Sequence, residues 1–230
     1  MSEPDIFYIL GNKVRRDLLS HLTCTECYFS LLSNKVSVSS TAVSKHLKIM
    51  EREGLLKSYE KEGKFIGPVR KYYKITLSST YVVTVTPNLF WYKGIKLDGK
   101  PELRKFEIDL ENLEESPATL QAMVINLIDA NKQLYTLLEA LKSLESYRDM
   151  LVKRIKEHYL DEIGDMTQLA ILHYLMLYGE ATIEDLSDRF NIKEREVIKK
   201  AEELNKFVPL IIKDNGTIKI DEEKLRKLVK

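Results

Sequence analysis

The chain has 230 residues, of which 44% are hydrophobic and 31% are charged, and its formal net charge is +1. Its length allows one larger domain or two small ones, and no apolar run approaches the ~20 residues of a membrane span, which excludes a membrane-spanning protein. The start MSEPDIFYILG lacks the features of a secretion signal, and two cysteines are too few for a disulfide framework, so we expect a soluble, cytoplasmic protein.

The small net charge hides an uneven distribution along the chain. Residues 1–80 contain 13 Lys and Arg against 8 Asp and Glu, whereas residues 161–230 contain 12 against 15. A basic segment favours an anionic partner such as nucleic acid. We therefore expect such a partner at residues 1–80.

Residues 1–80 show the order of a winged helix-turn-helix domain. Apolar residues from Pro4 to about Thr23 follow helical spacing, with Gly11 as a bend or interruption, and residues 28–34 indicate a second short helix. A third helix, residues 39–53, is expected between Ser39 as N-cap and Gly54. The alternating stretches of residues 55–77, around a tip that contains glycine and proline, predict a β-hairpin, the wing.

The middle of the chain contains two segments of different predicted secondary structure. Residues 81–115 contain YVVTV, NLFWYKGIKL and FEIDL, which predict a β-rich connector of unassigned pairing. Residues 116–160 predict one long helix, with Ser116 as N-cap and Pro117 at its first position. A narrow stripe at heptad spacing favours a coiled coil that joins two copies, although packing on the chain's own core is the alternative. The leucines of this dimerisation stripe are Leu120, Leu127, Leu134, Leu137, Leu141 and Leu144.

Residues 161–230 repeat the first pattern and predict a second winged-helix-like domain. Three helical stretches precede a hairpin, with a capping box expected at Thr182 and Asp185 and a type I′ turn at Asn215-Gly216. A closing helix is expected from Asp221. The third helical stretch, KEREVIKKAEELNKF, is rich in glutamate, which phosphate repels. A protein-contact, dimer-stabilising or effector-responsive role is therefore favoured there, and a second DNA contact stays open. The fold class expected for the whole chain is α+β, mostly α.

The helix at residues 39–53 has an outer face of hydroxyls and lysines. Small side chains near a helix N-terminus allow close approach to the major groove of DNA, and lysines can reach phosphates or guanine. The alternative is a solvated helix face beside a good N-cap, but the adjoining basic hairpin favours DNA, since such a wing can lie over the backbone or in the minor groove. The predicted DNA-binding residues are Ser39, Ser40, Thr41, Ser44, Lys45, Lys48, Lys64, Arg70 and Lys71.

His21, Cys24 and Cys27, at the predicted turn between two helices, are candidate metal ligands. A closed zinc site takes four ligands, which this cluster does not supply by itself. A reversible disulfide is a second alternative. A structural pair without a metal is favoured, because two cysteines underfill the coordination sphere.

Three stretches together resemble the ArsR-type winged-helix repressors: ILGNKVRRDLLSHL, SSTAVSKHLKIMEREGLL and GPVRKYYKI. The closer likeness is to archaeal ArsR-like regulators with a C-terminal extension, such as the heat-shock regulator of hyperthermophiles. The resemblance covers the first 80 residues and implies that the VSKHL helix reads the major groove while the PVRKYY hairpin is the wing. Those roles fall on Ser40, Ser44, Lys45, Lys48 and Arg70.

Catalytic motifs are missing from the sequence. It contains no Gly-rich phosphate loop, no nucleophile elbow and no HExxH, so neither an enzyme nor a cofactor is expected. The leading hypothesis is a homodimeric, sequence-specific regulator that binds double-stranded DNA. The competing hypothesis is a winged-helix scaffold for protein interactions in a transcription or chromatin assembly, without sequence-specific DNA reading.

Overall fold

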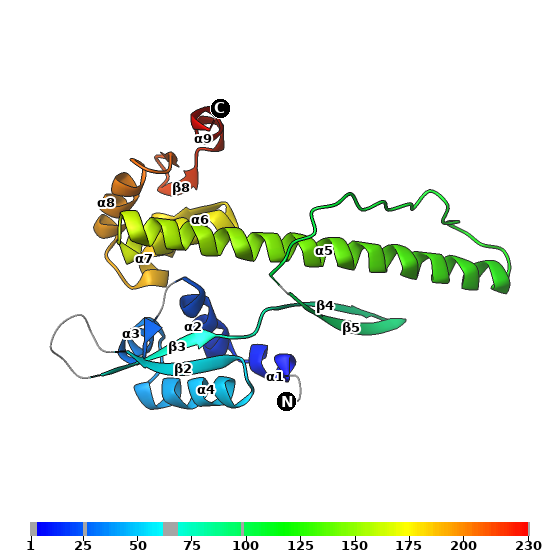
Figure 1. The fold of residues 1–230 in the computed structure, drawn as a ribbon, viewed down its shortest axis with the longest axis horizontal. Coiled ribbons are helices and arrows are strands. Elements are labelled where there is room, and N and C mark those ends of the chain that lie inside the picture. Colours follow the sequence, from blue (N-terminus) through cyan, green and yellow to red (C-terminus); the bar gives the residue numbers. More distant parts are fainter. Residues whose placement is uncertain (1–3, 25–26, 62–68, 98, 230) are drawn as a thin grey trace. The chain divides into compact units, whose positions relative to one another are not determined.

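The computed structural model describes residues 4–24, 27–61, 69–97 and 99–229. They form helices and small antiparallel sheets, which confirms the expected α+β, mostly α class (Figure 1). The chain divides into two compact units. Unit 1 contains Met1–Leu77 and Lys156–Lys230, and unit 2 contains Ser78–Ile155.

Unit 1 begins with a winged helix, in the order that the sequence predicts. Its helices are α1 (Ile6–Leu10), α2 (Lys13–Cys24), α3 (Phe29–Lys35) and α4 (Ser40–Arg52). Its strands are β1 (Cys27–Tyr28), β2 (Leu56–Lys61) and β3 (Arg70–Ile75), in the spatial order β1-β3-β2. The apolar side chains at helical spacing meet in one core, which includes the fully buried Ile9, Leu18, Leu32, Val43, Leu47 and Met50.

Gly11 separates α1 from α2, which confirms the predicted interruption. Its N–H donates to the Phe7 carbonyl at 2.8 Å, and a Cβ at Gly11 would lie only 3.0 Å from that oxygen. Arg15 of α2 then holds α1 in place. Its buried guanidinium donates from Nε to the Ile9 carbonyl at 2.8 Å and lies 4.6 Å from the centroid of the Tyr8 ring.

The wing is a regular hairpin. Strands β2 and β3 pair from Leu56 opposite Ile75 to Lys61 opposite Arg70, as the alternating sequence predicts. Residues 62–68 of its tip, including Lys64, lie outside the described residues. Strand β1 pairs with β3 but was not predicted, because two residues are too short to show an alternating pattern.

The C-terminal part of unit 1 is a second winged helix, as predicted. Its sheet order, β6-β8-β7, repeats the β1-β3-β2 order of the first. Its elements are α6 (Met166–Tyr178), β6 (Glu180–Thr182), α7 (Ile183–Phe190), α8 (Glu194–Leu204), β7 (Leu210–Ile212), β8 (Thr217–Ile220) and α9 (Glu222–Leu228).

Two local predictions in this domain have different outcomes. The capping box is confirmed, because the Thr182 hydroxyl accepts from the Asp185 N–H at 3.0 Å and the Asp185 carboxylate accepts from the Thr182 N–H at 3.4 Å. The type I′ turn is wrong, because it needs positive φ at both central residues and only Gly216 has it, at 78°. The Asn215 side chain accepts from the Thr217 N–H at 3.1 Å, and the loop closes through a bond from the Gly216 N–H to the Lys213 carbonyl.

Unit 2 contains a hairpin, an irregular segment and most of a long helix (Figure 1). Strands β4 (Ser79–Thr86) and β5 (Leu89–Lys96) confirm the strands predicted in YVVTV and NLFWYKGIKL. The strand predicted in FEIDL, residues 106–110, is wrong, since that segment is irregular. Its backbone bonds to a side chain of the long helix and not to a neighbouring strand. The bond is from the Asp109 N–H to Gln133 Oε1, at 3.0 Å.

Helix α5 (Leu120–Glu162) confirms the predicted long helix but begins later than expected. Its N-terminus is capped by Thr119, whose hydroxyl accepts from the Ala122 N–H at 3.2 Å, so Ser116 and Pro117 precede the helix. At 1.5 Å per residue it extends for roughly 65 Å. Among the described residues, no helix combines the length and apolar character that a membrane crossing requires.

Candidate nucleic-acid interface

Helix α4 presents one face to the core and the opposite face to solvent. Ser39 starts the helix as predicted, because its hydroxyl accepts from the Ala42 N–H at 3.3 Å. Val43, Leu47 and Met50 are fully buried, which fixes the rotation of the helix about its axis. The first turn contains no acidic side chain, so the partial positive charge of the helix N-terminus is not neutralised from within α4.

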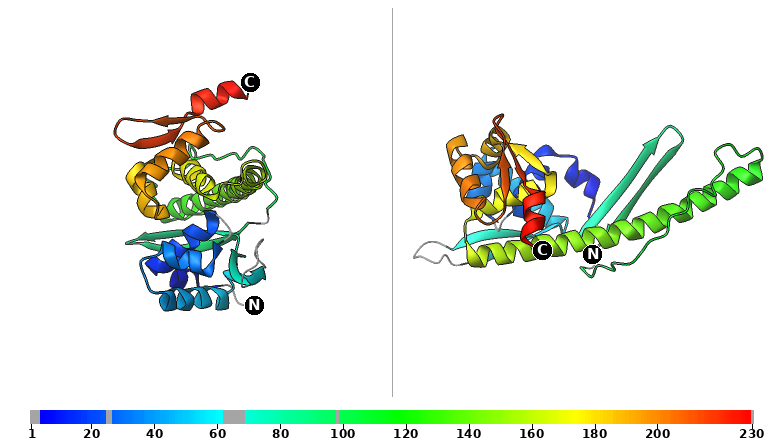
Figure 2. Two further views of the ribbon diagram at one scale, coloured as in Figure 1. Left: turned by 90° about the vertical axis from the view of Figure 1, so that its left-hand side faces the viewer. Right: turned by 90° about the horizontal axis from the view of Figure 1, so that it is seen from above.

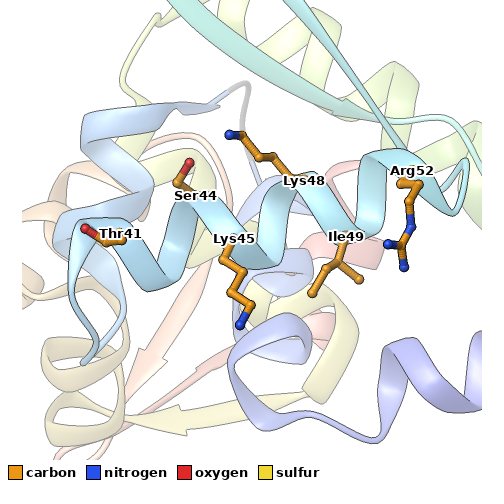
Figure 3. Close-up of a pocket in the computed structure, with 6 residues that line it drawn as sticks. All are labelled: Thr41, Ser44, Lys45, Lys48, Ile49 and Arg52. Atoms are coloured by element: carbon orange, nitrogen blue, oxygen red, sulfur yellow. The ribbon is translucent and has the colours of Figure 1, made fainter.

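The outward face of α4 forms a shallow hollow of about 480 Å³. Figure 3 shows the side chains around it, with Ser44 and Lys48 on one side of the helix axis and Lys45, Ile49 and Arg52 on the other. All the lining residues belong to α4, and they are Thr41, Ser44, Lys45, Lys48, Ile49 and Arg52. The predicted residues Ser39 and Ser40 are exposed at the start of the same helix. This face can offer hydroxyl and cationic donors to an extended anion.

The charge on this face comes from its lysines and from Arg52. Within the described part of the chain, neither Lys45 nor Lys48 forms an ion pair with a carboxylate, whereas Arg52 lies 2.9 Å from Glu53. His46 contributes little charge, because burial, followed by the nearby Arg15 and Lys45, lowers the pKa of its imidazole.

The wing adds two exposed cations beside aromatic packing. Arg70 and Lys71 are exposed on β3, close to the hairpin tip. Tyr72 stacks on Tyr59 of β2 with 5.7 Å between ring centroids, and Tyr73 is buried, so that burial raises the pKa of its hydroxyl. The tyrosines therefore pack the wing, and the basic residues Arg70 and Lys71 are exposed on it.

Helix α4 and the wing are tied together. One carboxylate oxygen of Glu51 accepts from the Ser58 N–H at 3.0 Å and from the Ser58 hydroxyl, and these bonds lower the pKa of Glu51. The Thr76 hydroxyl, just after β3, lies 3.1 Å from the Gly54 carbonyl and 3.2 Å from the Leu55 carbonyl. Such bonds hold two surfaces in a constant relative position, which a shared ligand requires.

The equivalent helix of the second domain has a different surface. Helix α8 carries Glu194 and Glu196 in its first turn, where α4 carries no acid. Its Lys200 lies 2.6 Å from Asp165 and 3.3 Å from Glu203, so this lysine holds its own domain together. The hydrogen bond that the Lys200 ammonium donates to the Asp165 carboxylate is the main cause that raises the pKa of Lys200. The basic face of α4 therefore has no counterpart on α8.

The structure describes only part of the group of candidate metal ligands. Cys24 ends α2 and Cys27 begins β1, and the side chains of both lie outside the described part of the chain. His21 is buried, and its pKa is lowered to about 4 by burial and by the cations of Lys35 and Arg189. Its imidazole is therefore neutral near pH 7. The structural role of Cys24 and Cys27 without a metal therefore stays a prediction.

Two residues of the outward face were not predicted from the sequence. Ile49 follows Lys45 by four residues and Arg52 follows Lys48 by four residues, so each begins one turn after its lysine on the outward face of α4. That four-residue spacing was sufficient to predict both residues from the sequence. An apolar side chain among cations can contact the methyl group of thymine, and an arginine can bond guanine.

Comparisons with known proteins match two parts of unit 1. Residues 12–58 match the family described as "Bacterial regulatory protein, arsR family", a span that covers α2, α3, α4 and the start of β2. Residues 182–224 match the family described as "PF0095-like, C-terminal domain". No curated protein matches the chain. The chain therefore carries an ArsR-type helix-turn-helix domain at residues 12–58, a type of domain found in DNA-binding transcription regulators, and a C-terminal extension with a PF0095-like domain at residues 182–224.

Proposed function

We propose that the chain is a homodimeric, sequence-specific regulator in which α4 enters the major groove and the β2–β3 wing lies over the backbone or the minor groove. The observation that carries the proposal is the outward face of α4, which offers hydroxyls and lysines while its opposite face is locked in the core. Ser39, Ser40 and Thr41 bond phosphates at the helix N-terminus, where the helix dipole favours anions.

The remaining contacts divide between base edges and backbone. Ser44, Lys45 and Lys48 lie along α4 where a helix in the groove meets base edges and phosphates. Arg70 and Lys71 act from the wing, with Lys64 assigned to its tip from the sequence alone. The bonds between Glu51 and Ser58 support the joint action of helix and wing, because they connect the two elements.

Dimerisation is supported by how little apolar surface unit 2 buries. Within the described part of Ser78–Ile155, the buried hydrophobic residues are Ile95 and Leu138, whereas unit 1 has a continuous core under each winged helix. A unit of this size needs far more burial to be stable by itself. Exposed side chains follow the heptad of α5, namely Leu120, Met123, Leu127, Leu137 and Leu144. Two copies of α5 that pair along this stripe cover it.

A dimer places two copies of α4 on one DNA molecule, so the expected operator is two-fold symmetric with half-sites separated by about one helical turn or a multiple of it. The second winged helix, with its acidic α8, then serves a protein contact, stabilises the dimer or responds to an effector. The alternative is a protein-interaction scaffold built from winged helices, which has no preferred DNA sequence.

Selection of bound fragments from a random pool of DNA duplexes tests the proposal and separates it from the alternative. We expect enrichment of one two-fold symmetric sequence and strong salt dependence of its binding. Retention of the pool without any enriched sequence contradicts sequence-specific reading. Failure to retain DNA at low salt contradicts the proposal as a whole and favours the scaffold.

A further inference from the structure

The β4–β5 hairpin has an exposed apolar face. Its register places Val83 opposite Tyr92 and Val85 opposite Phe90, and residues directly opposite each other in an antiparallel pair point to the same side of the sheet. The exposed fractions of these residues are 44% for Val83, 57% for Tyr92, 73% for Val85 and 70% for Phe90. An isolated two-stranded hairpin is marginal in water, and exposed aromatic and β-branched side chains of this kind mark an interaction site.

The other face of the hairpin already has a partner in its own chain. Lys93 lies on that face, and its Nζ is 4.5 Å from the centroid of the Tyr135 ring of α5. Ile95, two residues along β5 on the same face, is buried. The outer face, with Val83, Val85 and Phe90, is therefore directed away from the chain's own helix.

The first turns of α5 carry more apolar surface than a two-stranded coil covers. Besides the stripe positions Leu120, Met123 and Leu127, the side chains of Val124, Ile125 and Ile128 are exposed by 49% to 57%. At about 100° per residue Val124 lies beside the stripe, whereas Ile128 and Ile125 lie progressively further round the helix, toward the side opposite the stripe. A helix paired through the stripe therefore leaves this flank (Val124, Ile125 and Ile128) in water. Figure 1 shows the turn of the hairpin directed toward this end of α5, and Figure 2 shows the hairpin diverging from its own helix.

We infer that the outer face of the β4–β5 hairpin packs on the α5 flank of a second copy of this chain. The inference rests on the proposed homodimer and extends it from a two-helix coil to an assembly of two helices and two hairpins. Each protomer then contributes the hairpin face (Val83, Val85, Phe90 and Tyr92) and the flank (Val124, Ile125 and Ile128). Each of these half-exposed side chains can bury on the order of 100 Å² of surface in the contact. Summed over the hairpin face and the flank of one protomer, the buried area approaches the roughly 800 Å² per partner of a standard interface.

A second copy fits better than another macromolecule because both halves of the contact occur on the same unit. The hairpin face and the flank are apolar, and both are exposed in a single copy. Two-fold symmetry makes each contact occur twice, with the hairpin of each protomer on the flank of the other.

The first test is the dissociation constant of the full-length dimer, measured by analytical ultracentrifugation. Val85→Thr with Phe90→Thr removes the apolar side chains and keeps residues that favour strands. We expect the dissociation constant to rise by about tenfold or more. The matched control is Ile211→Thr with Phe207→Thr, which removes one aliphatic and one aromatic exposed side chain from unit 1 and should change the constant by less than about twofold.

The outcomes separate this inference from the proposal beneath it. A wild-type chain that stays monomeric at micromolar concentration contradicts the homodimer itself. A wild-type dimer whose dissociation constant is the same in the hairpin variant contradicts the hairpin contact alone.

A second measurement does not depend on a destabilising variant. Photo-crosslinking benzoylphenylalanine at position 90, in a mixture of ¹⁴N- and ¹⁵N-labelled chains, should give mixed-isotope links to residues 120–128 of the other copy. Links that join only chains of the same isotope label, or that fall outside residues 120–128, overturn the inference.

Discussion

Ser58 of the wing donates both its backbone N–H, at 3.0 Å, and its hydroxyl to one carboxylate oxygen of Glu51 on α4. The two residues are seven positions apart and belong to the two elements that carry the proposed DNA contacts. The charge-assisted bonds lower the pKa of Glu51, so their contribution to stability is present above the unfolded-state pKa of 4.5 and is lost as the pH falls through the lower folded-state value.

The first prediction concerns this pair. In a double-mutant cycle of Glu51→Gln and Ser58→Ala, we expect a coupling of about 1 kcal/mol in the free energy of unfolding, measured by urea denaturation at pH 7. We also expect weaker DNA binding in both single variants, because helix and wing no longer keep a constant relative position. Additive effects of the two substitutions on stability would show that the bonds do not contribute.

The second prediction concerns the α5 stripe. Leu127→Asp with Leu137→Asp places charges at positions that are exposed in one copy but buried in a coil, so the substitutions should spare the single chain and dissociate the dimer. The expected cost to association is several kcal/mol. Sedimentation should find monomers, whereas Glu139→Asp, on an exposed position off the stripe, should stay dimeric. A double aspartate variant that sediments as the wild type does would refute the coil.

The third prediction concerns pH. His21 of α2 and His173 of α6 are buried, and burial with nearby cations lowers the pKa of each to about 4. An unfolded histidine takes up a proton near pH 6.5 and the folded ones do not, so stability is fully present above pH 6.5 and declines as the pH falls toward 4. From pH 7 to pH 5 the free energy of unfolding should fall by roughly 2 kcal/mol for each histidine.

Urea denaturation at pH 7, 6 and 5 measures this decline. His21→Gln and His173→Gln should each flatten it, whereas His158→Gln, at an exposed position of α5, should not. An equal decline in all three variants would assign the pH dependence to other groups.

The fourth prediction concerns Cys24 and Cys27. Because two thiols underfill a zinc site and the adjacent Glu26 opposes thiolate formation, we expect a structural role for the pair. Cys24→Ser with Cys27→Ser should keep DNA affinity within about threefold under reducing and oxidising conditions, and purified wild-type protein should hold less than about one zinc per chain. Stoichiometric zinc, or release of DNA on oxidation that the serine variant abolishes, would make the chain a sensor.

The elements that the sequence predicts well are those with strong local signals. The start of α4 follows from the Ser39 cap, the wing follows from its alternation, and the second winged helix follows from the capping box at Thr182 and Asp185. In each case the local preference agrees with the burial pattern of the folded domain, so one structure satisfies both.

The predictions from sequence fail where contacts between residues distant in the sequence, or competing local hydrogen bonds, determine the structure. FEIDL has the alternation of a strand, yet its backbone bonds to Gln133 of α5, far along the chain. Thr119 and Ser116 are both acceptable caps, and the structure uses the later one. The Asn215 side chain bonds to the Thr217 N–H and excludes the expected turn. For the outward face of α4, the hydroxyls and lysines were predicted, whereas Ile49 and Arg52 were not, although their four-residue spacing from the lysines places them there.

DNA affinity as a function of salt concentration is the most direct test of the proposed function. The test variant combines Lys45→Ala, Lys48→Ala and Arg70→Ala, and on the selected operator it should bind about a hundredfold more weakly than the wild type. The slope of log affinity against log salt should become flatter by about 0.9 for each phosphate that the variant no longer neutralises. Its thermal unfolding should be unchanged. The matched control, Lys193→Ala with Lys199→Ala and Lys206→Ala around α8, removes equal charge and should keep both the affinity within about threefold and the slope. Equal affinity and equal slope for the α4–wing variant and the wild type would contradict the assignment of this face to DNA.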